Sequence, residues 1–231
     1  MPPVKKPKKK PARRKRLSPA ERVRVDALFD RFSTLAENPK TELNFSSPFT
    51  LVVAVALSAQ ATDVQVNKAT ARLFAVADTP QAIYDLGVDG LIPWINSIGL
   101  FRNKAKNVIE LSRIILEKHG GQTPLNREDL QALPGVGRKT ASVVLNELDI
   151  EPAIAVDTHV FRVSHRLKLS TGKTPDTVEA DLMAIVPTPY LTRAHHWLIL
   201  HGRYVCLARK PKCQECQVAD LCPSRELFMG G

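Results

Sequence analysis

The sequence predicts an all-α fold of about ten helices, and three features of its 231 residues support this. Hydrophobic residues make up 44% of the chain but aromatic residues only 6%, so the apolar content is mostly aliphatic and suits helices better than sheets. Residue types that cap helix N-termini recur before stretches in which apolar side chains repeat every three or four positions. No stretch alternates apolar and polar residues as a half-buried strand would, and no Asn-Gly or Asp-Gly turn joins two such stretches.

Capping boxes mark two helices near the N-terminus. Residues 18–21 read Ser-Pro-Ala-Glu, a capping box with proline at the first helical position. The apolar side chains that would share one face of this helix are Val25, Leu28, Phe29, Phe32 and Leu35. Residues 62–65 form a second capping box, whose helix would bury Val66, Ala69 and Leu73. Between the two, the apolar run over 49–59 has about half the length of a membrane span, so we expect a buried helix there.

Turn residues and further caps divide the rest of the chain. Thr79 begins a short helix that Gly87 ends, and Asp89 begins another that stops near Gly99. A longer helix covers 104–119 and stops at two consecutive glycines. The remaining residues that read as N-caps are Asn126, Asp157, Thr174 and Thr192.

The formal net charge of +10 is concentrated at the N-terminus. Residues 1–16 contain nine Lys and Arg and no acid, which leaves +1 for residues 17–231. We expect residues 1–17 to form a disordered basic tail that is attracted to polyanions, although an import signal or a solubility tail would have the same composition. No apolar segment follows the basic stretch as in a secretory signal, so we expect a soluble intracellular protein with no membrane partner.

Residues 133–141 read Leu-Pro-Gly-Val-Gly-Arg-Lys-Thr-Ala and predict two helices joined by a tight hairpin. Pro134 ends the first helix, and Gly135 and Gly137 allow a turn with positive φ. The second helix begins at Arg138, and its buried face would consist of Ala141, Val144, Leu145 and Leu148. With no side chain in the way, its first backbone N–H groups can bind a phosphate. The alternative reading is an ordinary turn between helices.

Two charged residues at helix starts are candidates for catalysis. Lys139 lies in the first turn after the hairpin, where the helix dipole and Arg138 disfavour a protonated amine, and a lysine nucleophile must be neutral. A surface lysine that pairs with phosphate fits this position equally well. Asp157 would cap the next helix, and a capping carboxylate is ionised and firmly held, which also suits stabilisation of a developing cation. We expect His159 on that helix to make a structural hydrogen bond rather than to act as a catalyst.

All four cysteines lie within 17 residues, at positions 206, 213, 216 and 222. Such clustering in a chain without a secretory signal favours a metal centre over disulfides. Only Cys213 and Cys216 form a close pair, whereas zinc sites usually have two close pairs. The spacing from Cys206 to Cys222 therefore favours a [4Fe–4S] cluster over zinc. Between the first two ligands lie three basic residues, Arg209, Lys210 and Lys212, which give the loop a local positive charge.

Five separated motifs together resemble the endonuclease III family of helix–hairpin–helix DNA glycosylases. They are residues 57–63 (Leu-Ser-Ala-Gln-Ala-Thr-Asp), 97–100 (Ser-Ile-Gly-Leu), 133–141, 156–159 (Val-Asp-Thr-His) and the cysteine loop, in the family's order. The resemblance covers about residues 20 to 223. It implies a base excision repair enzyme that removes damaged pyrimidines and then cleaves the strand as an AP lyase.

The resemblance also implies an architecture and roles for individual residues. The fold would comprise a six-helix barrel domain over 41–151, a [4Fe–4S] cluster domain over 18–40 and 152–231, and a DNA groove between them. Lys139 matches the family's Schiff-base lysine and Asp157 its catalytic aspartate. The residues that fill the gap left by a flipped nucleotide would be Gln60, Leu100 and Ile98.

Asp63 and His159 would lie near the lesion pocket, and the expected partner is double-stranded DNA with a damaged base or an abasic site, bound by a monomer at the nucleoid. The related adenine glycosylases carry Ser where this chain has Lys139, an acidic residue near Gln60 and a long C-terminal domain, so they match less well. A non-catalytic DNA-binding module or a redox carrier would leave Lys139 and Asp157 without a role.

Overall fold

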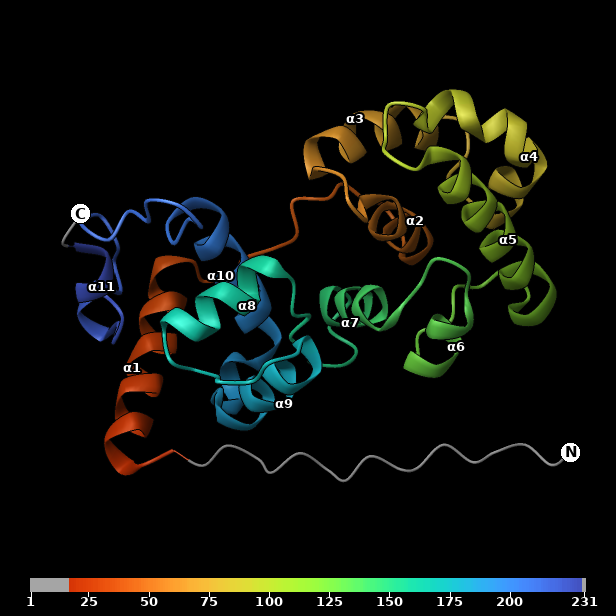
Figure 1. Ribbon diagram of the computed structural model, residues 1–231. Helices are drawn as coiled ribbons and strands as arrows, with labels where there is room; N and C mark the ends of the chain where they lie inside the picture. The colour runs from red at the N-terminus through yellow and green to blue at the C-terminus, as the bar shows by residue number, and fades with distance from the viewer. Residues whose placement is uncertain (1–16, 230–231) are drawn as a thin grey trace, which may run out of the picture. The chain divides into compact units, whose positions relative to one another are not determined.

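The computed structural model describes residues 17–229, and within that range the protein consists of eleven α-helices and two short 3-10 helices without any strand. The prediction of an all-α fold is therefore confirmed. Contacts divide this part of the chain into two compact units (Figure 1). The hairpin unit comprises 36–155 and 191–197, and the cysteine unit comprises the chain up to Leu35, Val156–Tyr190 and the chain from Leu198 onward.

Six helices make up most of the hairpin unit, shown from orange to green in Figure 1. They are α2 (Pro48–Ser58), α3 (Asp63–Phe74), α4 (Pro80–Ile95), α5 (Phe101–His119), α6 (Arg127–Ala132) and α7 (Arg138–Glu147). Helix α2 contacts α3, α5 and α7, and every side chain from Phe49 to Leu57 is buried. Burying a Val, Leu or Phe side chain contributes roughly 1.5–3 kcal/mol, so the predicted buried helix over 49–59 is the core of this unit.

Two residues with positive φ, Gly87 and Leu100, set helix boundaries in the middle of the hairpin unit. Gly87 interrupts α4 with φ 62° and ψ 174°, which confirms the predicted break, and the helix resumes directly, before Asp89. Helix α5 begins at Phe101, three residues before the predicted start. Its N-terminal boundary was missed because Leu100 adopts a left-handed conformation and no side chain caps the helix, so the sequence carries no capping signal there.

The cysteine unit contains the first helix and the last third of the chain. Its elements are α1 (Pro19–Leu35), α8 (Thr158–Arg166), α9 (Pro175–Ile185), η1 (Thr188–Tyr190), the end of α10 (Leu191–Tyr204), η2 (Ala219–Leu221) and α11 (Glu226–Met229). Helix α1 buries Leu28 and Phe29 completely. It is also tied to distant segments, because Arg22 donates to the carbonyl of Ile185 (2.7 Å) and Arg24 to that of Leu167 (3.0 Å).

Most of the predicted helix caps are present. Capping boxes join Ser18 to Glu21 and Thr62 to Gln65, and side-chain caps occur at Thr79, Asn126, Asp157 and Thr174. The cap predicted at Thr192 is wrong: the N-cap of α10 is Tyr190, two residues earlier, because the 3-10 turn η1 leads directly into the helix. Leu35, predicted on the buried face of α1, is 53% exposed because the helix ends there.

Other expectations concern the ends of the chain and its domains. The basic tail predicted over 1–17 lies, except for residue 17, outside the described residues. The predicted domain boundaries remain a prediction, and contacts group 191–197 with the hairpin unit. Within 17–229, none of the helices combines the length and apolarity that crossing a membrane requires.

Candidate functional site

The hairpin at 133–138 has one left-handed glycine, not two. Gly135 adopts φ 78°, and a Cβ added there would lie 3.1 Å from both Cβ and Nδ2 of Asn107, so both backbone and packing require glycine. Gly137 adopts φ −81° with extended ψ and a Cβ there would meet nothing within 4 Å, so the predicted positive φ at Gly137 is wrong. Val136 between them is buried and anchors the hairpin to the core.

Lys139 is exposed in the first turn of α7, directly after this hairpin. Gly137 occupies the N-cap position, so no side chain caps the helix and its first N–H groups are available to an external acceptor. The other end of α7 is held firmly. Asn146 donates to the carbonyl of Thr192 (2.8 Å) and accepts from the N–H of Ala153 (3.0 Å).

A buried contact between a carboxylate and an imidazole adds to this anchoring of α7. Oε2 of Glu147 lies 2.9 Å from Nε2 of His196 on α10, and both side chains are almost fully buried. The rigid C-terminal end and the uncapped N-terminal end together place an amine and a helix start without a side-chain cap at the same exposed position of the hairpin unit.

The turns that carry Gln60 and Leu100 lie side by side although 40 positions separate them in the chain. A Cβ built on Gly99 would be 3.8 Å from the carbonyl oxygen of Gln60, and both Gln60 (φ 55°) and Leu100 (φ 60°) are left-handed. Such backbone conformations are uncommon for residues other than Gly, Asn and Asp, and they concentrate at functional sites. Leu100 is 60% exposed, which is unusual for a large apolar side chain in an ordered turn.

Ile98 and Asp63 lie in the same region but differ in exposure. Ile98 is 1% exposed and belongs to the core of the hairpin unit, so it supports the turn from inside and does not fit the expected contact with DNA. Asp63 is the first residue of α3, three positions after Gln60, and is half-buried.

Asp157 caps α8 in the cysteine unit. Its Oδ1 accepts the backbone N–H groups of His159 and Val160, each at 2.8 Å, so the carboxylate is held in one orientation at the positive end of the helix dipole. His159 packs closely on α10, because a Cβ added to Gly202 would lie 2.9 Å from the Cβ of His159. Its Nδ1 lies 3.3 Å from a guanidinium nitrogen of Arg162, which is the structural hydrogen bond that we expected.

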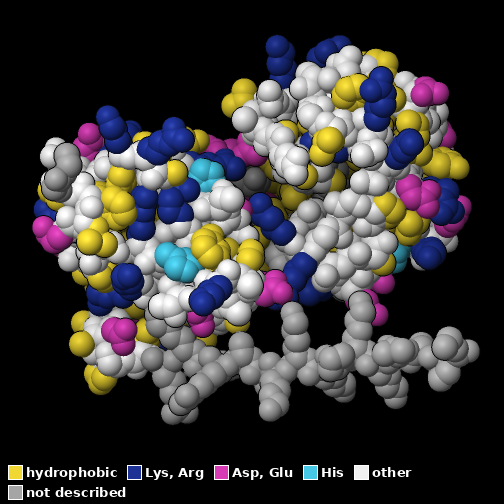
Figure 2. Space-filling view, in the orientation of Figure 1, with side chains coloured by type: hydrophobic (Ala, Val, Ile, Leu, Met, Phe, Trp, Pro, Cys, Tyr) yellow, Lys and Arg dark blue, Asp and Glu magenta, His cyan; other side chains and the backbone are white. Residues whose placement is uncertain are grey.

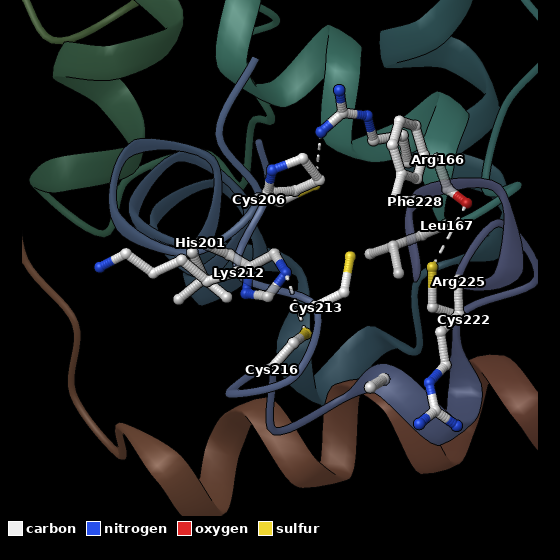
Figure 3. Close-up of a pocket in the computed structure, with 13 residues that line it drawn as sticks. Arg166, Leu167, His201, Cys206, Lys212, Cys213, Cys216, Cys222, Arg225 and Phe228 are labelled. Atoms are coloured by element: carbon white, nitrogen blue, oxygen red, sulfur yellow. Dashed lines mark hydrogen bonds between the residues drawn. The ribbon is translucent and has the colours of Figure 1, made fainter. Parts of the chain in front are cut away.

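The four cysteines line a common pocket in the cysteine unit (Figure 3). The surface that lines it is largely apolar, and the side chains that complete it include the aliphatic Leu167, Val205, Pro211 and Ala219. The chain between Cys206 and Cys222 wraps around the sulfur atoms, so that residues spaced over 17 positions converge. Within 17–229, no three His, Cys, Asp or Glu side chains are arranged to hold a single metal ion.

The electrostatics of the pocket favour positively charged metal among the thiols. Burial raises the pKa of Cys216 and Cys222, and the negative charges of the neighbouring cysteines raise it further. In the opposite direction, the backbone N–H groups of Val218 and Ser224 donate to these two sulfur atoms. Four thiolates cannot share this pocket without cations, whereas iron would neutralise them and keep both N–H···S hydrogen bonds.

Several residues around the pocket were missed from the sequence. Arg166 donates to the Cys206 sulfur at 3.4 Å, and Nε2 of His201 lies 3.8 Å from the Cys216 sulfur. Burial lowers the pKa of His201 to about 4, so its ring is neutral and can donate to a metal-bound thiolate. Arg162 donates to the carbonyl of Cys206 at 3.1 Å. The local sequence of these residues carries no signal for a metal pocket, because helix packing brings them to the cysteines.

The three basic residues predicted in the loop are exposed: Arg209, Lys210 and Lys212. Lys212 also lines the pocket, and its backbone N–H is hydrogen-bonded to the carbonyl of Val205 (3.0 Å). Figure 2 shows several Lys and Arg side chains over the part of the cysteine unit where α8 and α10 lie. The loop therefore provides a positive surface next to the metal pocket.

Comparison with known protein families gives two matches. Residues 53–188 match the model of the HhH-GPD superfamily of base excision DNA repair proteins. Residues 206–222, which contain all four cysteines, match the iron–sulfur binding domain of endonuclease III.

Individual relatives agree with these matches. Endonuclease III of Escherichia coli (strain K12) is 57% identical over 189 residues, which cover 82% of this chain and 90% of the relative. Endonuclease III of Rickettsia conorii is 54% identical over 198 residues, which cover 86% of this chain and 94% of the relative. A solved structure of a trapped endonuclease III–DNA covalent intermediate is similar with a TM-score of 0.84 and 40% identity, covering 93% of this chain and all of the other. A thermostable thymine-DNA glycosylase shares the fold with a TM-score of 0.77 at 22% identity.

Proposed function

The chain belongs to the endonuclease III family of HhH-GPD base excision repair proteins, and we propose that Lys139 and Asp157 carry out its chemistry. It is a bifunctional DNA glycosylase and AP lyase, and it carries an iron–sulfur cluster. The position of Lys139 supports its role as the nucleophile most directly. It is an exposed amine in the first turn of an uncapped helix, after the hairpin 133–138.

In this proposal Lys139 is the nucleophile. Its neutral amine attacks C1′ of the damaged nucleotide, the bond from C1′ to the base nitrogen breaks, and the base leaves with a proton. The sugar ring then opens: the C1′–O4′ bond breaks, O4′ takes the second amine proton, and the imine that forms between Lys139 and C1′ makes the C2′ proton acidic. Removal of that proton expels the 3′ phosphate by β-elimination, which cuts the strand.

Asp157 has the role of a fixed negative charge. The two N–H groups that it accepts at 2.8 Å hold the carboxylate in one orientation, so no reorganisation is needed when positive charge develops on the sugar. We further propose that it assists proton movement during base release. Asp63 and His159 remain candidates for contacts near the lesion, with His159 already engaged by Arg162.

The contacts that position DNA would come from three surfaces. The uncapped N-terminus of α7 with Gly135 and Gly137 would bind a backbone phosphate, because its N–H groups face outward and the helix dipole favours an anion. Gln60 and Leu100, on their paired left-handed turns, would fill the gap left by the flipped nucleotide. The exposed basic residues of the cysteine loop would bind phosphates without reading sequence: Arg209, Lys210 and Lys212.

Cys206, Cys213, Cys216 and Cys222 hold the [4Fe–4S] cluster. When bound, the cluster supplies four cross-links that fix the fold of the basic loop. Arg166, His201 and the backbone N–H groups of Val218 and Ser224 would donate hydrogen bonds to the ligand sulfurs.

We propose that the substrate is double-stranded DNA with an oxidised or otherwise damaged pyrimidine or an abasic site, and that the enzyme acts as a monomer. A trapped covalent complex and a non-covalent complex with DNA are both known for relatives with a TM-score of 0.84. From this substrate we infer that the protein works in the cytoplasm, at the nucleoid.

Borohydride trapping tests the role of Lys139. Lys139→Gln should abolish base release and the trapped protein–DNA species while duplex binding persists, because only the amine forms an imine that borohydride can reduce. The matched control is Lys106→Gln, which removes an exposed lysine of α5 in the same unit and should leave trapping intact. If the Lys139→Gln protein is still trapped, another amine is the nucleophile.

A further inference from the structure

The last helix of the described chain closes one side of the cysteine pocket. Helix α11 contributes Phe228, which lines the pocket together with the four cysteines (Figure 3). Phe228 is 37% exposed, whereas its neighbour Leu227 is 76% exposed and does not line the pocket. Of these two adjacent apolar side chains, only one is directed toward the metal ligands.

Phe228 contacts Arg166, which in turn contacts two of the cysteines. The guanidinium carbon of Arg166 lies 4.3 Å from the centre of the Phe228 ring, in the geometry of a cation–π contact. The same guanidinium donates to the Cys206 sulfur at 3.4 Å and to the carbonyls of Leu207 (2.6 Å) and Ala208 (3.0 Å). At the other end of the pocket, the Cys222 sulfur lies 3.7 Å from the backbone carbonyl oxygen of Arg166. Arg166 thus contacts the first and the last ligand, and the Phe228 ring covers it.

Within 223–229, the segment after Cys222 is anchored by the buried Ser224, whose N–H donates to the Cys222 sulfur, whereas Glu226 and Leu227 of α11 are exposed. Its backbone forms single-turn hydrogen bonds from Arg225, Leu227 and Phe228, with lengths of 3.0–3.2 Å, and α11 is only four residues long. A helix of only four residues opens locally at a small free-energy cost, so each side-chain contact changes the open fraction measurably.

We propose that α11 is a cover for the iron–sulfur cluster, and that Phe228 keeps it closed by stacking on Arg166. In the closed state the ring excludes water and small solutes from the side of the pocket next to Cys206 and Cys222, and it holds Arg166 on the Cys206 sulfur. Phe228 is therefore a positioning residue for the cofactor and has no part in the reaction on DNA.

Release of iron from the holoenzyme to an excess of a coloured iron chelator tests this proposal. Phe228→Ala should accelerate iron release and the loss of visible cluster absorbance about five- to thirtyfold, the change in open population that corresponds to about 1–2 kcal/mol of cation–π contact. Leu227→Ala removes an apolar side chain of similar size from the same helix and should release iron at the wild-type rate. Phe228→Trp keeps an aromatic face over Arg166 and should restore slow release.

The cleavage rate of freshly prepared, fully loaded protein separates this proposal from the proposed enzymatic function. All three variants should cleave damaged duplex at the wild-type rate, because none of them changes a residue proposed to touch DNA. Equal iron release from the Phe228→Ala and wild-type proteins would overturn the proposal. So would equal acceleration by Leu227→Ala and Phe228→Ala, which would mean that any weakening of α11 has this effect.

Discussion

Asp157 combines a structural and a proposed catalytic task, and substitutions can separate the two. Its Oδ1 accepts two backbone N–H groups at 2.8 Å, those of His159 and Val160, at the start of a nine-residue helix whose first turns bury Val160 and Val163. An asparagine keeps an oxygen in the same place, so Asp157→Asn should lose only the charge–dipole term, about 0.3–1 kcal/mol of stability. Asp157→Ala leaves both N–H groups without their acceptor and should cost about 0.5–2 kcal/mol.

The loss of cleavage rate should not follow the order of the two stability losses. Both substitutions remove the negative charge that we propose stabilises the developing cation, and one preorganised group of this kind is typically worth about 10²–10³ in rate. We therefore expect single-turnover cleavage at saturating enzyme to fall by about that factor in Asp157→Asn and Asp157→Ala alike. Thermal unfolding of the same two proteins should show the alanine variant to be the less stable.

A second capped helix in the same unit provides the control. Thr174 caps α9 through a capping box with Thr177, so Thr174→Ala should lower stability by about 0.5–2 kcal/mol and leave the cleavage rate unchanged. The reasoning is refuted if Asp157→Asn cleaves at nearly the wild-type rate, since Asp157 would then be only a cap. It is also refuted if Thr174→Ala slows cleavage as much as Asp157→Ala, since loss of stability would then explain both.

Two further predictions concern the cluster and the paired turns. Purified protein should be yellow-brown and contain about four iron atoms per chain, and colourless protein with one zinc would contradict the cluster. Cys216→Ser should remove the colour and lower the thermal unfolding temperature. Leu100→Ala should slow cleavage of a lesion in intact duplex far more than that of a lesion in an already unstacked site, because Leu100 is proposed to hold the gap open. Equal losses on the two substrates, measured by single-turnover incision, would instead assign Leu100 a packing role.

Local signals in the sequence determined most of the helices. The caps at Thr62, Thr79, Asn126 and Thr174 were predictable because a capping side chain bonds to backbone only two or three residues away. The starts of α5 and α10 were not predictable in this way. Neither helix has a side-chain cap, and their boundaries depend on turns that the surrounding core stabilises.

For the candidate sites, too, some features could be predicted from the sequence and others depend on tertiary structure. The spacing of the four cysteines made them candidate ligands from the sequence, and the family resemblance made Lys139 and Asp157 candidate catalytic residues. That Ile98 is buried, that Gly137 is not left-handed, and that the turns of Gln60 and Leu100 meet became visible only in the structure.

Tertiary structure alone also decided what surrounds the cysteines. Arg166, His201 and Phe228 come from three separate helices, and nothing in their local sequence indicates a metal pocket. Their position depends on how α8, α10 and α11 pack within one unit. A hydrogen-bonded cap is a contact between near neighbours in the chain, whereas a pocket wall is a contact between segments that only the completed core brings together.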